Sequence, residues 1–212
     1  MSRPMVQASS NVFTFAEYLT YDDGTDVRHE LVRGYLLAMT PPAWSHVKIA
    51  RFLEDLFRSE IRRLGSPWDA IRGDVGQRTG FADSRLPDVL VAPSADLEQL
   101  RDRPAVLETP ALLVVEIVSK SSVRDDYLHK LAEYEAIGVQ EYWLVDYLAL
   151  GASRYLGIPK APTVFVYTLS DVDVMMTERE YAQPRKFQGS DRIQSPLFPE
   201  LDVTAAAIFE GE

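Results

Sequence analysis

Apolar positions along the chain fall into two patterns, and these predict strands and helices in alternation. Residues 41–65 carry apolar side chains at helical spacing and end at Gly65, a residue type common at helix ends. Short apolar runs at 87–93, 112–118, 141–146 and 163–169 predict strands. A second helical pattern, 121–138, lies between two of these runs, with Ser121 or Ser122 as the cap and Gly138 as the end. This strand, helix, strand order predicts a parallel pair.

Weaker patterns complete the expected organisation. We expect a short helix over 13–20 entered at Thr14, a hairpin within 26–39 that turns at Arg33-Gly34, and one irregular strand over 68–80. A charged loop should extend to Pro110 and another loop should cover 147–162. A strand pair within 172–186 and a short closing element near the C-terminus should follow. Residues 13–212 are expected to form a single domain after a flexible N-terminus, 1–12.

Glu116 breaks the most apolar of these runs. From Leu112 to Val118 all residues except Glu116 are apolar, so both faces of the strand should be buried. An unpaired ionised carboxylate in such surroundings costs several kcal/mol. Some other group must therefore compensate the charge of Glu116.

Asp88, at the start of the apolar run 87–93, is the first candidate to bind a compensating cation together with Glu116. If the two strands are adjacent, Asp88 and Glu116 could together hold Mg²⁺, which is commonly bound by one or two carboxylates. Lys130 lies on the helix that follows the Glu116 strand. Its ammonium group could orient water or stabilise negative charge on a phosphate.

Each of these residues also has a purely structural interpretation. Asp88 follows a proline and could be a turn residue, and Glu116 could pair with a structural arginine. Lys130 could be a solvated helix residue whose charge is satisfied by Asp126, four positions earlier. Spacing alone does not decide between the two interpretations.

Composition limits the other possibilities. The 212 residues are 46% hydrophobic and contain no cysteine, which excludes disulfides and thiolate chemistry and favours the cytoplasm. No apolar run is long enough for a membrane span or a signal peptide. The net charge of −10 disfavours binding of nucleic acid through a general electrostatic field, although basic residues cluster at 58–65.

Five segments in order carry a resemblance to a known family. They are "HELVRGYLLAM", "SHVKIARFLEDL", "PDVLV", "PALLVVEIVSKSS" and "RDDYLHKLAEYEAIGVQEYWLVD". Together they resemble the Uma-type restriction endonuclease family, within the PD-(D/E)XK nuclease superfamily, from about residue 14 through 146. A weaker similarity lies in "IQSPLFPELDVTAAAIF". The resemblance implies a restriction-endonuclease-like α/β (α+β) fold, in which helices flank a central mixed sheet, and Mg²⁺-dependent hydrolysis of DNA.

The resemblance assigns roles residue by residue. Asp88 matches the aspartate of the "PD" motif, Glu116 the acidic residue of the next strand, and Lys130 a helix lysine that replaces the usual strand lysine. The chain departs from the simplest superfamily pattern at Val118, where that strand lysine would stand. Lys120, in the following loop, is a second possibility.

Accessory positions follow from the same resemblance. Glu30 could hold a metal-bound water or a second ion, or be a strand-edge surface residue, and His46 could be catalytic or a capping residue. Tyr134 lies one turn beyond Lys130 and could position it. Ser119 and Asp125 also match, and we interpret them as loop and cap residues.

The leading hypothesis is a cytoplasmic endonuclease that uses Mg²⁺, or Mn²⁺ in its place, and acts on DNA as a homodimer. The first alternative is a non-catalytic interaction or regulatory protein that retains the nuclease scaffold, supported by the acidic composition and by Val118. A weaker alternative is a metal-dependent hydrolase of small phosphate esters.

Overall fold

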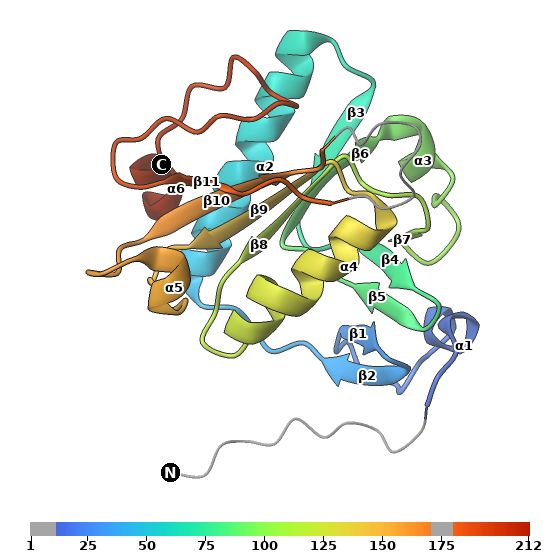
Figure 1. The fold of residues 1–212 in the computed structure, drawn as a ribbon. Coiled ribbons are helices and arrows are strands. Elements are labelled where there is room, and N and C mark those ends of the chain that lie inside the picture. The colour runs from blue at the N-terminus through green and yellow to red at the C-terminus, as the bar shows by residue number, and fades with distance from the viewer. Residues whose placement is uncertain (1–11, 171–179) are drawn as a thin grey trace.

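A six-stranded mixed sheet forms the centre of the fold. The computed structural model describes residues 12–170 and 180–212 (Figure 1). The strand order is β11-β10-β9-β8-β6-β3. The bounds are β3 Trp68–Ile71, β6 Val89–Pro93, β8 Leu113–Ile117, β9 Glu141–Asp146, β10 Thr163–Thr168 and β11 Arg185–Phe187. β8 and β9 are parallel, as expected, and the other neighbouring pairs are antiparallel.

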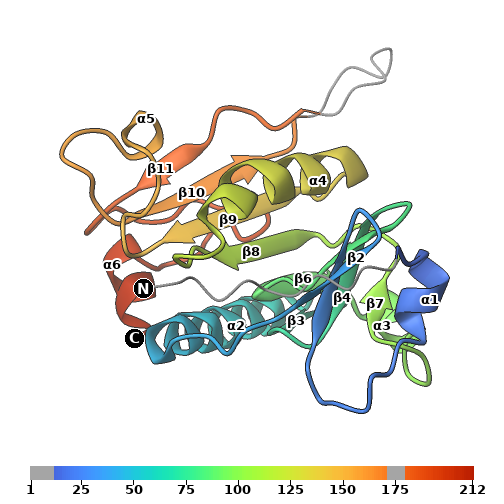
Figure 2. The same ribbon diagram turned by 90° about the horizontal axis from the view of Figure 1, so that it is seen from below.

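Two helical layers cover this sheet on opposite faces (Figure 2). Helix α2, Trp44–Leu64, packs its apolar side against one face, where Phe57 stacks on Phe198 and meets Trp143 edge-on. Gly65 ends α2 in the left-handed conformation, as the sequence predicts. The opposite face is covered by helix α4, Lys130–Ile137, which ends at Gly138. Strand β8 is therefore buried on both faces.

A π-helical turn, η1, leads into α4. It spans Asp125–His129, and the Lys130 N–H donates to the Asp125 carbonyl, five residues earlier. The helical segment begins directly after Ser122, as expected, but the Ser122 hydroxyl donates to the Asp126 carboxylate and does not accept from an N–H of the first turn. π-turns inside helices are frequently found at functional sites.

A second, five-stranded mixed sheet packs beside the first. Its order is β2-β1-β5-β4-β7, with bounds β1 His29–Val32, β2 Tyr35–Ala38, β4 Gly76–Gly80, β5 Asp83–Arg85 and β7 Val106–Leu107. The predicted hairpin is present as β1 and β2, and Arg33 and Gly34 both have positive φ in its turn. Helix α1, Phe15–Leu19, precedes it and begins at the Thr14 capping box.

The sequence patterns were wrong in the middle of the chain. The single strand expected over 68–80 is two strands, β3 and β4, which belong to different sheets. β5 was not expected, since its Asp83-Ser84-Arg85 segment has no apolar alternation. The expected charged loop contains helix α3, Ser94–Glu98, and strand β7.

Two short helices lie in the C-terminal part. Helix α5, Ser153–Leu156, falls within the expected loop 147–162, and α6, Ala205–Glu210, is the expected closing element. Of the strand pair expected within 172–186, residues 172–179 lie outside the described part, and β11 occupies its end. No helix among the described residues is both long and apolar enough to cross a membrane.

Candidate active site

The charge of Glu116 is compensated by Lys130. Glu116 is 2% exposed and Lys130 is 7% exposed. The Lys130 ammonium donates to Glu116 Oε2 at 2.7 Å, and the Tyr134 hydroxyl donates to Glu116 Oε1 at 2.7 Å. One carboxylate on the sheet therefore receives two donors from α4, spaced one helical turn apart.

Asp88 lies beside Glu116 at the end of the sheet. Val89 pairs with Val115 in the antiparallel β6–β8 ladder, so one further step along the same register puts Asp88 opposite Glu116. Asp88 Oδ2 accepts from the Ile117 N–H at 2.7 Å, which fixes it to the Glu116 strand. Its Oδ1 lies 2.8 Å from His46 Nε2, in the first turn of α2.

Asp126 is a further acid in contact with Lys130. Its Oδ1 lies 3.1 Å from the Lys130 ammonium, Oδ2 accepts from Ser122, and the residue is 1% exposed. The sequence interpretation of Lys130 as a solvated residue is therefore wrong, although its expected partner Asp126 is correct. From the sequence, Asp126 was expected as a structural partner of Lys130 and not as part of the candidate site.

Glu30 reaches the same cluster from β1 but is held mainly by an arginine. Arg85 Nη1 donates to Glu30 Oε2 at 3.1 Å, and the Leu86 N–H donates to Oε1. The Lys130 ammonium is 3.9 Å from Oε1. Arg85, which is 1% exposed, also binds Glu133 of α4 and so joins the second sheet to this helix. Glu30 is thus a buried residue of the cluster, and its interpretation as a surface residue is wrong.

Acidic groups outnumber basic ones around Lys130. Four carboxylates act on its charge: Asp126, Glu116, Glu30 and Asp88. Burial would lower the pKa of Lys130, but these carboxylates raise it well above its ordinary value. Burial raises the pKa of Glu116 well above its usual range, Lys130 opposes this, and the nearby Asp88 adds to it. Lys130 is therefore held as a cation within an excess of negative charge.

This donor set fits a hard divalent cation. Among the described residues no arginine pairs with Asp88 or Glu116, and their oxygens belong to the class that Mg²⁺ and Mn²⁺ prefer. In the described ranges no three His, Asp or Glu side chains form a complete metal cage. That is consistent with Mg²⁺ chemistry, in which one or two carboxylates suffice and waters and phosphate oxygens supply the rest.

Other predicted residues lie around the cluster without joining it. Val118 is fully buried under α4, so this position has no charged group, and Lys120 is exposed on the loop. Ser119 contacts the hydroxyls of the next serines, as expected of a loop residue. Asp125 does not cap the helix but lies 2.7 Å from His129 Nδ1.

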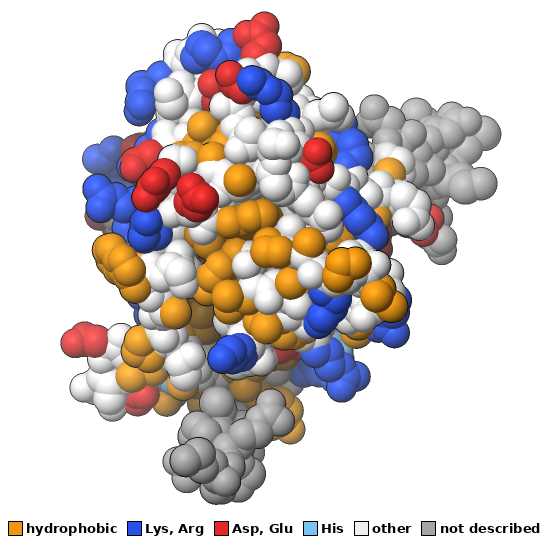
Figure 3. Space-filling model, turned by 90° about the vertical axis from the view of Figure 1, so that its left-hand side faces the viewer, with side chains coloured by type: hydrophobic (Ala, Val, Ile, Leu, Met, Phe, Trp, Pro, Cys, Tyr) orange, Lys and Arg blue, Asp and Glu red, His pale blue; other side chains and the backbone are white. Residues whose placement is uncertain are grey.

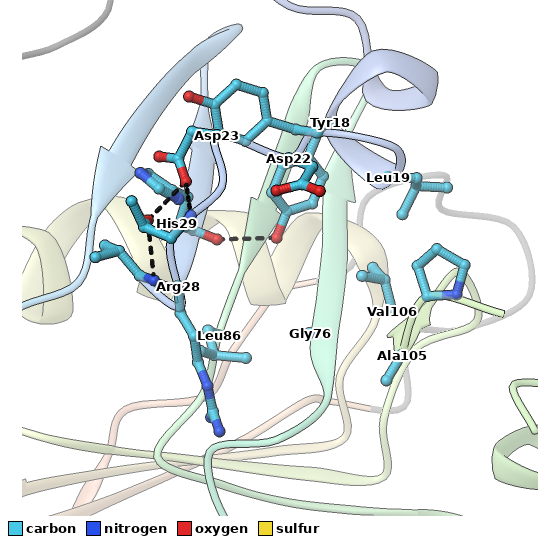
Figure 4. Close-up of a pocket in the computed structure, with 14 residues that line it drawn as sticks. Tyr18, Leu19, Asp22, Asp23, Arg28, His29, Gly76, Leu86, Ala105 and Val106 are labelled. Atoms are coloured by element: carbon cyan, nitrogen blue, oxygen red, sulfur yellow. Dashed lines mark hydrogen bonds between the residues drawn. The ribbon is translucent and has the colours of Figure 1, made fainter.

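A pocket of about 250 Å³ is lined by residues of α1, β1 and the start of β7, and none of the cluster's carboxylates lines it (Figure 4). His29, beside Glu30, lines it from β1, and adjacent strand residues face opposite sides of a sheet. The carboxylates of Asp22 and Asp23 accept from the nearby Gly24 and Thr25 N–H groups. The candidate site is therefore the Glu116 cluster and not this pocket.

Comparisons with known proteins agree with this fold. The sequence profile of the Uma2 family, described as "Putative restriction endonuclease", matches residues 15–206. The chain is 25% identical over 162 residues to "Uncharacterized protein sll1609" of Synechocystis sp. (strain ATCC 27184 / PCC 6803 / Kazusa), covering 71% of this chain and 84% of that protein. A crystal structure of a "putative nuclease belonging to DUF820" from Anabaena variabilis ATCC 29413 superposes with a TM-score of 0.69. That match covers 94% of this chain and 98% of the other at 17% identity, and it shows a common fold.

Proposed function

Because the chain belongs to the Uma2 family, we propose that it is a metal-dependent endonuclease that hydrolyses DNA phosphodiester bonds. The observation that carries the proposal is the buried contact between Glu116 and Lys130, next to Asp88. The packing of β8 does not require a buried lysine beside two carboxylates that have no arginine partner among the described residues. An apolar side chain at position 116 would pack as well without removing a charge from water.

Asp88 and Glu116 would hold Mg²⁺ or Mn²⁺, which supplies a polarised water and neutralises charge on the phosphate. The chain's own residues contribute position and charge. His46 and the Ile117 N–H fix the Asp88 carboxylate, and the Tyr134 hydroxyl fixes that of Glu116. Lys130, held beside Glu116, would place a positive charge where the attacked phosphate gains negative charge.

Removal of either carboxylate tests the proposal. We expect Glu116→Gln and Asp88→Asn to reduce Mg²⁺-dependent or Mn²⁺-dependent cleavage of plasmid and linear DNA by about 100-fold or more. The matched control is Glu98→Gln, an exposed carboxylate paired with Arg101, which should leave cleavage unchanged. Circular dichroism confirms folding of each variant. Cleavage that survives Glu116→Gln would defeat the assignment.

The same assay separates the alternatives. A non-catalytic scaffold would show no metal-dependent cleavage in the wild-type protein, and a small-ester hydrolase would cleave nucleotides in preference to DNA.

Cutting both strands of a duplex needs two active sites, so a homodimer is part of the proposal. Light scattering during size-exclusion chromatography would measure its mass.

A further inference from the structure

Lys186 lies in the same cross-strand row as the candidate active site. Glu116 of β8 pairs with Leu144 of β9, Leu144 with Phe165 of β10, and Phe165 with Lys186 of β11. Residues paired in this way point to the same face of a sheet, and three strand spacings amount to about 14 Å. The Lys186 ammonium lies 5.6 Å from the centre of the Phe165 ring, on the face that carries Glu116.

More cations gather around Lys186 at helix α5. The Lys186 ammonium donates to the Tyr155 carbonyl at 2.6 Å, and the guanidinium of Arg154 lies over the Tyr155 ring. Lys160 donates to the Gly151 carbonyl at 3.0 Å. These are neutral partners, and within the described ranges no acid pairs with the three cations.

The cations and aromatic rings around α5 continue toward the candidate active site. Tyr155 stacks on Tyr127 of η1 at 4.8 Å between ring centres, and Arg124 immediately precedes η1. Lys120 and Arg124 are exposed on the segment that leaves β8 just after Glu116. Together Lys120, Arg124, Arg154, Lys160 and Lys186 form what we call the basic strip. In the part of the chain that the structure describes, none of them forms an ion pair with Asp or Glu.

Several exposed arginines elsewhere are neutralised by acids. Arg28 pairs with Asp74, Arg101 with Glu98 and Arg103 with Glu108. These three cations are balanced by acids, whereas the cations of the basic strip have no acidic partner among the described residues. Figure 3 shows the face that bears α5 and α6, where Lys and Arg side chains gather toward the lower right and also at the left, where acids lie among them.

We propose that the basic strip binds the phosphate backbone of duplex DNA and leads it to the Glu116 cluster. This inference rests on the proposed function and adds the surface that holds the substrate. A distance of about 14 Å from Glu116 to Lys186 corresponds to about four base steps of 3.4 Å, so the strip would contact one flank of the cleaved bond. Exposed cations with neutral partners suit phosphate contacts, because binding breaks no ion pair.

The test measures binding separately from cleavage. A fluorescent 20-base-pair duplex is titrated in EDTA at several salt concentrations with wild-type protein and with Arg124→Gln/Arg154→Gln/Lys186→Gln. The control variant Arg28→Gln/Arg101→Gln/Arg103→Gln removes the same number of positive charges from ion-paired positions. We expect the strip variant to bind at least tenfold more weakly, with the salt slope of log K reduced by about 2–3. The control should change affinity less than twofold.

A second variant, Lys120→Gln/Arg124→Gln, keeps the test available if the triple variant folds poorly. The proposed role of the basic strip would be overturned if the strip and control variants lost affinity equally, or if neither lost affinity. It would also be overturned if the wild-type protein did not bind the duplex or bound RNA more tightly. Wild-type cleavage that persists in the strip variants would overturn the strip and leave the nuclease intact. Strip-dependent binding without any wild-type cleavage would support the strip and overturn the nuclease.

Discussion

Lys130 is the residue on which the candidate chemistry depends, because it is the cation that four carboxylates surround. Its ammonium lies 2.7 Å from Glu116 and 3.1 Å from Asp126. Glu116 is also a candidate metal ligand, whereas Asp126 is committed to Ser122 and Lys130. We therefore interpret Asp126 as a positioning residue that holds Lys130 in place while Glu116 serves the metal.

Replacement of Asp126 tests this interpretation. Asp126→Asn removes the charge that holds the ammonium, and we expect cleavage to fall about 10- to 100-fold, as for outer partners of other metal sites. The neighbouring Asp125→Asn is the control, since the Asp125 side chain contacts His129 and not the Lys130 ammonium. Kinetics give the rate, and thermal melting with Mn²⁺ should show that Asp126→Asn still binds metal. Loss of metal binding would make Asp126 a ligand and contradict the positioning role.

At the scale of elements, the site exists because three segments converge on one end of β8. The alternating residues of β8 send Val115 and Ile117 to α2 and leave Glu116 on the α4 side. The sequence predicts this strand and the crossover helix, so it brings Glu116 and Lys130 into the same region. It does not predict η1, and spacing alone could not show whether Asp125 or Asp126 faces inward.

Arg85 connects these elements, and its removal should be costly. It is 1% exposed and bridges Glu30 of β1 and Glu133 of α4. Arg85→Met would leave Glu133 without its cation and Glu30 with only the Lys130 ammonium at 3.9 Å, in a largely buried position. We expect the free energy of unfolding to fall by about 3–5 kcal/mol.

Urea unfolding followed by circular dichroism measures this change. Arg101→Met provides the comparison, because Arg101 pairs with Glu98 in full contact with solvent and should change stability little. Equal stability of Arg85→Met and the wild-type protein would show that the bridge contributes nothing net.

For the whole molecule, local pattern predicts the central sheet better than the second one. The apolar strands of the first sheet are buried on both faces, so their signal is strong in the sequence. β5 is short and polar, and it is ordered by partners distant in sequence: Ser84 pairs with Leu31, and Arg85 reaches Glu133. The position of Asp88 beside Glu116 likewise depends on strand register, which no local pattern specifies.

Metal binding should stabilise the whole fold, because Asp88 and Glu116 come from separate strands and meet only when the sheet is formed. At a free Mn²⁺ concentration of 100 times the dissociation constant, the gain is about 2.7 kcal/mol. For a domain of this size we expect the melting temperature to rise by about 5–11 °C. EDTA should reverse the rise, Asp88→Asn should abolish it, and Glu98→Gln should retain it. If Mn²⁺ raised the melting temperature of the wild-type protein and of Asp88→Asn equally, the ion would bind elsewhere. The proposed catalytic role of the Glu116 cluster would then lose its chemical basis.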